Sequence, residues 1–112
     1  MVDAFSSATE LAAAIKTKEV SSRELTDLYI DRVERYDGDI NAVVVRDFER
    51  GRKAAEAADA ALAKGQDLGP LHGVPMTIKE AYDIEGLPTT WGYPEFSENI
   101  ANSDADSVTR LK

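Results

Sequence analysis

The sequence predicts a chain that combines α-helices with short β-strands, on three observations. Two serines are each followed three residues later by a glutamate, the capping-box pattern that begins helices. Residues 42–45 form a compact apolar run rich in β-branched side chains, which is too short for a helix and favours a buried strand. Residues 74–78 alternate between apolar and other side chains, a pattern typical of a strand with one buried face.

The N-terminal part predicts two amphipathic helices. Ser7 with Glu10 begins the first helix, and Ser21 with Glu24 begins a longer second one. Gly38 stands where a left-handed residue would end the second helix. The apolar stripe of the first helix is Ala8, Leu11, Ala12 and Ile15. The stripe of the second is Leu25, Leu28, Tyr29, Val33 and Tyr36.

An alanine-rich helix is predicted after the first strand, so that residues 1–64 hold three helices and one strand. Asp47 can cap its start, and Gly65 is a typical residue just after a helix end. Glu49 and Lys53 are spaced to form an ion pair on its surface. Small residues fall on one side and would allow a neighbouring segment to approach closely: Gly51, Ala54, Ala58 and Ala61.

The stretch 69–92 predicts a defined irregular path, because all four prolines lie in it or just beyond it and it is rich in glycine. The second predicted strand lies inside this stretch. Val74, Met76 and Ile78 form its apolar face, and Lys79 follows at its end. A lysine delivered at a strand end beside glycine-rich turns is a candidate for chemistry.

The last segment, 103–112, predicts the start of a helix. Ser103 with Asp106 resembles a helix start, but the chain reaches Lys112 after barely two turns without a stop signal. A helix that short is marginal by itself. We therefore expect this helix to be truncated and the chain to be a fragment of a longer protein.

Composition excludes several classes of function. The 112 residues are 43% hydrophobic and 30% charged, which is typical of one globular domain. The formal net charge of −8 argues against binding to nucleic acid or to anionic membranes. The absence of cysteine excludes disulfides, thiol nucleophiles and zinc–cysteine sites within this sequence. With no apolar run long enough to span a membrane and no signal pattern, we expect a cytoplasmic protein.

Few side chains in this sequence are candidates for catalysis. His72 is the only histidine, so no site with two histidine ligands can form, and a structural or exposed role is favoured for it. The serines have no glycine neighbours, and most lie at predicted helix starts, where capping explains them. Lys79 remains. A lysine with the usual pKa of about 10.4 is protonated, and spacing alone favours an exposed lysine; a buried, neutral one could take a proton from a hydroxyl.

Two motifs carry a resemblance to a known family. The run GPLHGVPMTIKE, from Gly69 to Glu80, and the run GLPTTWG, from Gly86 to Gly92, closely resemble the amidase signature family around its catalytic lysine. The similarity extends over nearly the whole chain, in the order and spacing of its predicted segments. The resemblance implies an α/β fold with a mixed β-sheet flanked by helices, of which this chain would supply only the N-terminal part of a single amidase domain.

The resemblance also implies a function. Members of the family hydrolyse carboxylic acid amides with a serine–serine–lysine triad, and Lys79 matches the catalytic lysine. That lysine acts through a bridging serine, which follows a cis peptide, to activate the nucleophilic serine. An acyl-enzyme forms and is hydrolysed, and backbone amides of a Gly/Ser-rich loop supply the oxyanion hole. The resemblance implies no metal and no organic cofactor.

The chain departs from the family pattern in two respects. The Gly/Ser-rich segment that carries both serines is not within these 112 residues, so we expect the chain alone to be inactive. Glu80 stands where many relatives have aspartate, and the Lys-Glu form with Thr-Thr-Trp-Gly is more similar to hydrolytic amidases than to the transfer enzymes.

Two alternative functions stay open at this point. The first is the A subunit of a tRNA-dependent amidotransferase, which needs partner subunits. The second is a non-catalytic, stand-alone interaction module. For the hydrolase we expect a small-molecule amide as substrate, no nucleic acid or membrane as partner, and self-association into a homo-oligomer through apolar faces that lack their sheet neighbours.

Overall fold

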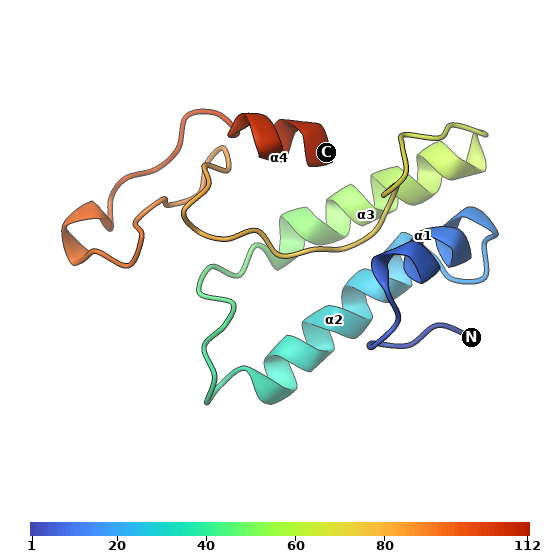
Figure 1. Cartoon of the computed structure of the whole chain (residues 1–112), viewed down its shortest axis with the longest axis horizontal. Coiled ribbons are helices and arrows are strands. Elements are labelled where there is room, and N and C mark those ends of the chain that lie inside the picture. The colour runs from blue at the N-terminus through green and yellow to red at the C-terminus, as the bar shows by residue number, and fades with distance from the viewer. The chain divides into compact units, whose positions relative to one another are not determined.

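The computed structural model describes all residues from 1 to 112 as two compact units, which are treated separately here (Figure 1). Unit 1 comprises Met1–Ala42 and Asp47–Met76, and unit 2 comprises Val43–Arg46 and Thr77–Lys112. The elements are α1 (Ala8–Lys16), α2 (Ser22–Tyr36), α3 (Phe48–Ala63), the 3₁₀ helix η1 (Pro94–Phe96) and α4 (Asp106–Leu111).

Both predicted capping boxes are confirmed, at the starts of α1 and α2. The Ser7 hydroxyl accepts the Glu10 N–H at 3.3 Å, and the Glu10 carboxylate accepts the Ser7 N–H at 2.7 Å. The same reciprocal pair joins Ser21 and Glu24, at 3.0 and 2.8 Å. Hydrogen bonds from the serine backbone and hydroxyl hold the pKa of each glutamate below its usual value of 4.5.

The core of unit 1 forms where α1 packs against α2. Leu11, Ile15 and Leu25 are buried there, and each lies on an apolar stripe predicted from the sequence. Partly buried side chains complete the cluster: Val2, Val20, Tyr29, Leu62 and Val74. The helical periodicity of the sequence thus located part of this core: Leu28 and Tyr36 of the predicted stripe are exposed, and the buried Ala14 and Ile30 were not predicted.

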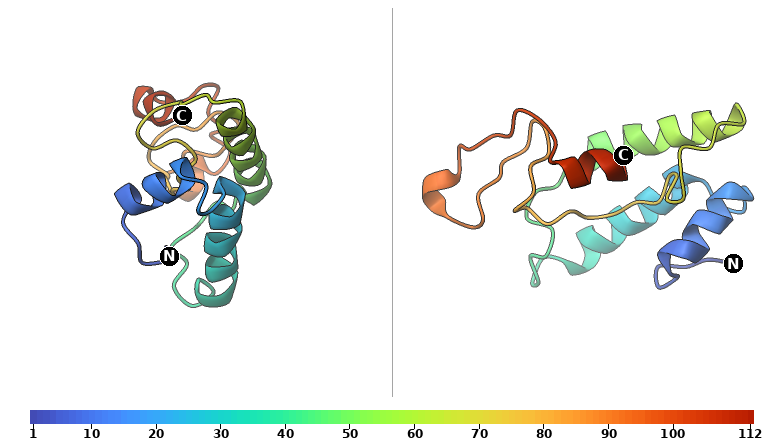
Figure 2. Two further views of the ribbon diagram at one scale, coloured as in Figure 1. Left: turned by 90° about the vertical axis from the view of Figure 1, so that its right-hand side faces the viewer. Right: turned by 45° about the horizontal axis from the view of Figure 1, so that its top comes forward.

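Helices α2 and α3 lie side by side (Figure 2), and polar side chains join them. Asp59 on α3 accepts the N–H groups of Ser22 and Arg23 at 2.8 and 3.0 Å, so that α3 supplies a second cap to the first turn of α2. Asp27 on α2 bridges Arg23 and Arg52 at 2.7 and 2.8 Å. These arginines lower the pKa of Asp27 through hydrogen bonds, with Arg52 the larger influence.

The predicted helix ends are confirmed at α3 and wrong at α2. Gly65 follows α3 with a φ of 76°, the left-handed conformation expected of it. Gly38 does not have a positive φ, and the left-handed residue after α2 is Asn41, with a φ of 54°. The reason is that Asp37 holds the chain in further turns: its carbonyl accepts the Asn41 N–H and its carboxylate accepts the Ala42 N–H, both at 2.7 Å.

Two expectations for the surface of α3 are also corrected. Asp47 occupies the position before α3, but its side chain makes no cap and instead pairs with Arg50 at 2.7 Å. Glu49 pairs with Arg52, not with Lys53, because the longer guanidinium reaches both Glu49 and Asp27. Of the small side chains on α3 the buried one is Ala55, which was not in the predicted stripe, and nothing lies within 4 Å of a Cβ built on Gly51.

The predicted strands do not pair, so the mixed sheet is not formed within this chain. Segments 42–45 and 74–78 have no hydrogen-bonded ladder, and the β-bridge present is an isolated antiparallel one between Pro88 and Ile100. A strand needs a second segment that pairs with it in a β-ladder, and neither segment forms such a ladder here. Val44 and Met76 accordingly stay exposed.

The C-terminal helix begins later than predicted. Helix α4 starts at Asp106, after Ala105, and not at Ser103. The Ala105 N–H donates to the Asp83 carbonyl at 2.9 Å, which ties the start of α4 to the loop after Lys79 within unit 2. Val108 of α4 is buried. No helix is long and apolar enough to cross a membrane.

The capping box of α2 makes stability depend on pH. Because the pKa of Glu24 is lowered by folding, its stabilising effect is present above the unfolded pKa, near 4.5, and is lost as the pH falls through the folded pKa. We expect Glu24→Gln to lower the urea midpoint of unfolding at neutral pH and to differ less from the wild type in acid. Glu34→Gln, which removes a charge from the same helix away from its start, is the control. If the urea midpoint of Glu24→Gln were lower than that of the wild type by the same amount at every pH, the role of the carboxylate would be contradicted.

Gly73 is held where a side chain would collide with α2. It has a φ of 74°, and a Cβ there would lie 3.0 Å from the Cβ of buried Ser22. Gly65 has a similar φ of 76° but open space around it. We expect Gly65→Ala to lower the free energy of unfolding by about 1–2 kcal/mol, from backbone conformation alone. Gly73→Ala should lower it by about 1–3 kcal/mol more, because its Cβ also collides with Ser22. Urea unfolding measures both; equal losses would show that the contact with Ser22 is unimportant.

Candidate functional site

Lys79 directly follows segment 74–78, which was predicted as a strand but forms no β-ladder here. Its carbonyl accepts the Tyr82 N–H at 3.0 Å, so the chain turns directly after it. The Lys79 side chain is exposed in this chain. The lysine is therefore presented at the junction of an extended segment and a turn, where a side chain can reach a neighbouring hollow.

A hollow of ≈ 440 Å³ lies beside Lys79, entirely within unit 2. Three separate segments meet there: one from the first predicted strand, one at the lysine and one from the TTWG motif. Its lining residues are Val44, Lys79, Glu80, Ala81, Thr90, Trp91 and Gly92. The hollow thus combines one cation and one carboxylate with apolar walls.

Glu80 connects the lysine segment to the TTWG motif. Its two carboxylate oxygens accept the backbone N–H groups of Thr90 at 2.8 Å and Trp91 at 3.0 Å. Hydrogen bonds to an ionised acceptor are stronger than neutral ones and contribute about 1.5–3 kcal/mol each. Because Glu80 is the next residue after Lys79, this pair of bonds fixes the motif relative to the lysine backbone.

The TTWG motif forms a tight turn with two left-handed residues. Trp91 has a φ of 51° and Gly92 a φ of 78°, and the Tyr93 N–H closes the turn on the Thr90 carbonyl at 2.9 Å. Positive φ at both central positions is the signature of a type I′ turn. Glycine adopts this conformation freely, whereas tryptophan does so at a cost of about 1–3 kcal/mol. The bonds from Glu80 and Tyr93 offset that cost.

The residues on either side of the turn are anchored within unit 2. Thr89 is 2% exposed, its N–H donates to the Asn99 carbonyl at 2.8 Å, and the Asn99 amide donates back to the Thr89 carbonyl at 2.8 Å. The Thr89 hydroxyl is buried without a hydrogen-bond partner. Phe96 packs edge-to-face against the ring of Trp91, with centroids 5.8 Å apart, and against Tyr93 at 6.0 Å.

His72 has a structural position in unit 1. Its Nδ1 accepts the Leu68 N–H at 3.0 Å, and its Nε2 lies 2.8 Å from the Ala58 carbonyl, to which it can donate as the Nε2–H tautomer. Both ring nitrogens therefore bind backbone groups that tie the loop before Gly73 to α3. This agrees with the structural role favoured from the sequence.

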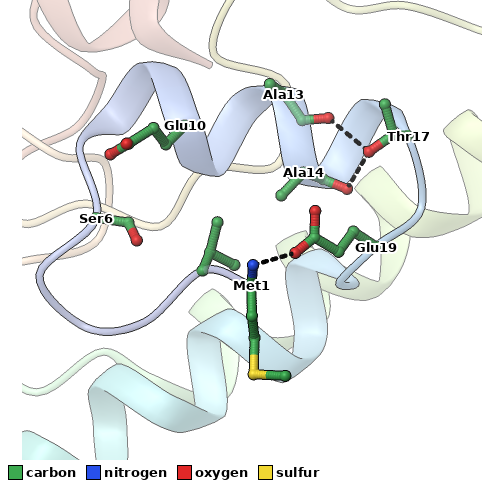
Figure 3. A pocket seen from close by; sticks show the side chains of 8 residues that line it. Met1, Ser6, Glu10, Ala13, Ala14, Thr17 and Glu19 are labelled. Carbon is green, nitrogen blue, oxygen red and sulfur yellow. Dashed lines mark hydrogen bonds and ion pairs between the residues drawn. The ribbon is translucent and has the colours of Figure 1, made fainter.

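A second hollow, of ≈ 410 Å³, lies in unit 1 and contains none of the predicted site residues (Figure 3). Several of its polar groups already bind one another: the N-terminal amine pairs with Glu19 at 3.3 Å, and the Thr17 hydroxyl donates to the Ala13 carbonyl at 3.0 Å (Figure 3). No group of three or more histidine, cysteine, aspartate or glutamate side chains is arranged to hold a metal ion.

Sequence reasoning identified Lys79 but missed the residues that organise its surroundings. Glu80 was noted only as a variation on aspartate, and its bonds to residues ten and eleven positions away leave no local signal. A glycine at position 92 indicates that a positive φ is possible there, but nothing in the sequence indicates that Trp91 also has one. Val44 joins the hollow from the first predicted strand, a contact that only the tertiary structure creates.

Comparison with known proteins places these features in a family. The Amidase family model matches residues 24–112. The chain is 46% identical over 106 residues to the indoleacetamide hydrolase of Bradyrhizobium diazoefficiens, covering 95% of this chain and 20% of that protein. It is 41% identical to the acylamidase of Rhodococcus erythropolis, over 95% of this chain and 22% of that protein. It is 42% identical to the A subunit of the glutamyl-tRNA(Gln) amidotransferase of Aromatoleum aromaticum, over 95% of this chain and 21% of that protein.

Solved structures agree with the sequence comparison. A bacterial aryl acylamidase of the amidase signature family superposes with a TM-score of 0.81 at 30% identity, over 87% of this chain and 20% of that one. A protein described in a vestigial complex related to an s-triazine catabolic enzyme superposes with a TM-score of 0.90 at 34% identity. The match covers 95% of this chain and 23% of that one. The chain thus spans about a fifth of the length of its relatives. From the family match and these likenesses, the chain belongs to the amidase signature family.

Proposed function

We propose that this chain is the N-terminal part of a hydrolase of carboxylic acid amides in which Lys79 is the base. The observation that carries the proposal is the position of Lys79 at the end of an extended segment, beside a hollow with a largely apolar wall. Two of the relatives are named as hydrolases of amides, an indoleacetamide hydrolase and an acylamidase. A pocket that combines apolar walls with one reactive group suits a small organic amide.

The proposed reaction needs two hydroxyl groups from outside these 112 residues. Neutral Lys79 would take a proton from a bridging serine, which in turn takes one from the nucleophilic serine as that serine attacks the amide carbonyl. The leaving amine accepts a proton and departs as ammonia or an amine, and water then hydrolyses the acyl-enzyme. By this proposal the chain alone is inactive, since it supplies only the base.

A neutral lysine must be shielded from water, because desolvation disfavours the charged amine. Lys79 is exposed in this chain. We propose that the hollow is covered in the complete enzyme by the part of the domain that the relatives have and this sequence does not contain. The same part would supply strands that pair with segments 42–45 and 74–78, which form no β-ladder here.

A second candidate is the A subunit of a tRNA-dependent amidotransferase. The observation in its favour is the 42% identity to the corresponding protein of Aromatoleum aromaticum. Such an enzyme would use the same lysine to release ammonia from glutamine. Co-purification of the full-length gene product with a tRNA-binding partner, together with glutamine-dependent ammonia release, would favour it over the hydrolase.

The role of Lys79 is tested by replacement in the full-length gene product. We expect Lys79→Ala to lower kcat for amide hydrolysis by about 10²–10⁴-fold, the usual contribution of a general base. Ammonia release from phenylacetamide and butyramide is the measurement. Lys53→Ala, which removes an exposed lysine of α3, is the control and should leave kcat unchanged. Near-normal turnover of the Lys79 variant would refute the assignment.

A further inference from the structure

The position of Trp91 depends on two independent constraints. Its backbone is left-handed, with a φ of 51°, and its N–H is bound by Glu80 at 3.0 Å. Its ring is bound from the side by Phe96, with the two planes at 89° and the centroids 5.8 Å apart. Backbone and ring are thus held by different residues, so each constraint can be removed without the other.

Glu80 links this geometry to the lysine. Both oxygens of its carboxylate are occupied by consecutive N–H groups of the turn, those of Thr90 and Trp91. Glutamine in its place has one acceptor oxygen and a donor amide, so with the side chain in the same position it would turn an N–H donor toward one of these two N–H groups. A carboxylate therefore suits this conformation of the turn better than an amide does.

Trp91 is the aromatic residue among those that line the hollow. It is 56% exposed, so much of its surface is available for contact. The other apolar residues that line the hollow, Val44 and Ala81, have smaller side chains. Aromatic rings bind one another through large buried areas and preferred stacked or edge-to-face geometries.

We propose that Glu80 is a positioning residue that holds Trp91 against the Lys79 hollow, and that Trp91 selects amides that carry an aromatic group. The inference rests on the proposed function, because it concerns the same hollow. Glu80 acts through the turn and does not itself touch the substrate. The substrate class is thereby narrowed from carboxylic amides in general to those with an aromatic ring near the amide.

The first experiment removes the backbone constraint in the full-length gene product. We expect Glu80→Gln to speed hydrogen exchange at the Thr90 and Trp91 amides. We also expect it to lower the ratio of kcat/KM for phenylacetamide to kcat/KM for butyramide by about tenfold, the equivalent of one aromatic contact. Glu80→Asp keeps both acceptor oxygens, so it should change the amide exchange and the selectivity ratio less than Glu80→Gln does. Glu98→Gln removes a charge from an exposed side chain of unit 2 that does not bind the turn, and should change neither.

The second experiment removes the ring constraint and leaves Glu80 in place. We expect Phe96→Ala to leave exchange at the Thr90 and Trp91 amides unchanged and still to lower the selectivity ratio. A loss of folding alone would reduce activity on both amides equally and would not move the ratio. This variant also keeps the inference testable should Glu80→Gln fail to fold.

Two outcomes would overturn the inference. Unchanged exchange of the Thr90 and Trp91 amides in Glu80→Gln would show that the carboxylate does not hold the turn. An unchanged selectivity ratio in the Glu80 and Phe96 variants would show that Trp91 does not select the substrate. Failure of the proposed function is a separate result: Lys79→Ala would then keep near-normal turnover, while exchange and selectivity would still decide the roles of Glu80 and Trp91.

Discussion

Carboxylate oxygens that accept backbone N–H groups hold this chain together at each of its critical points. Two such carboxylates begin α1 and α2, a third joins α3 to the first turn of α2, and a fourth fixes the turn beside Lys79. They belong to Glu10, Glu24, Asp59 and Glu80. An unpaired N–H group is costly wherever water is excluded, and a charged acceptor satisfies it strongly and at a defined angle.

The same interaction places the candidate site. Since Glu80 follows Lys79 in the chain, the bonds that Glu80 makes to the turn at residues 90–91 also determine what lies next to the lysine. The tryptophan in that turn has a conformation that it would not adopt by itself, and it is held there by contacts from both sides. Strain of this kind at a hollow beside a reactive side chain is typical of functional sites. The site is thus organised by a few strong contacts and not by an extended sheet.

The two segments predicted as strands, unlike the turn that Glu80 holds, do not form their expected structure within this chain. Segments 42–45 and 74–78 have the composition of strands, but neither forms a β-ladder within this chain. Helices satisfy their own backbone hydrogen bonds and form wherever periodicity and caps agree, but strands require another segment. The relatives are about five times as long as this chain, so it contains only a part of what they use to build the fold.

The sequence by itself determined the helices, part of the apolar core of unit 1, the family and the catalytic-lysine candidate. Those features depend on contacts within about four residues or on a contiguous motif, as the capping boxes at Ser7 and Ser21 show. Only the tertiary structure decided that Asp59 caps α2, that Glu80 binds the turn at residues 90–91, and that Trp91 adopts a positive φ. Each of these is set by a hydrogen bond or a packing contact whose partner depends on how the chain folds, and such a partner cannot be identified from local sequence.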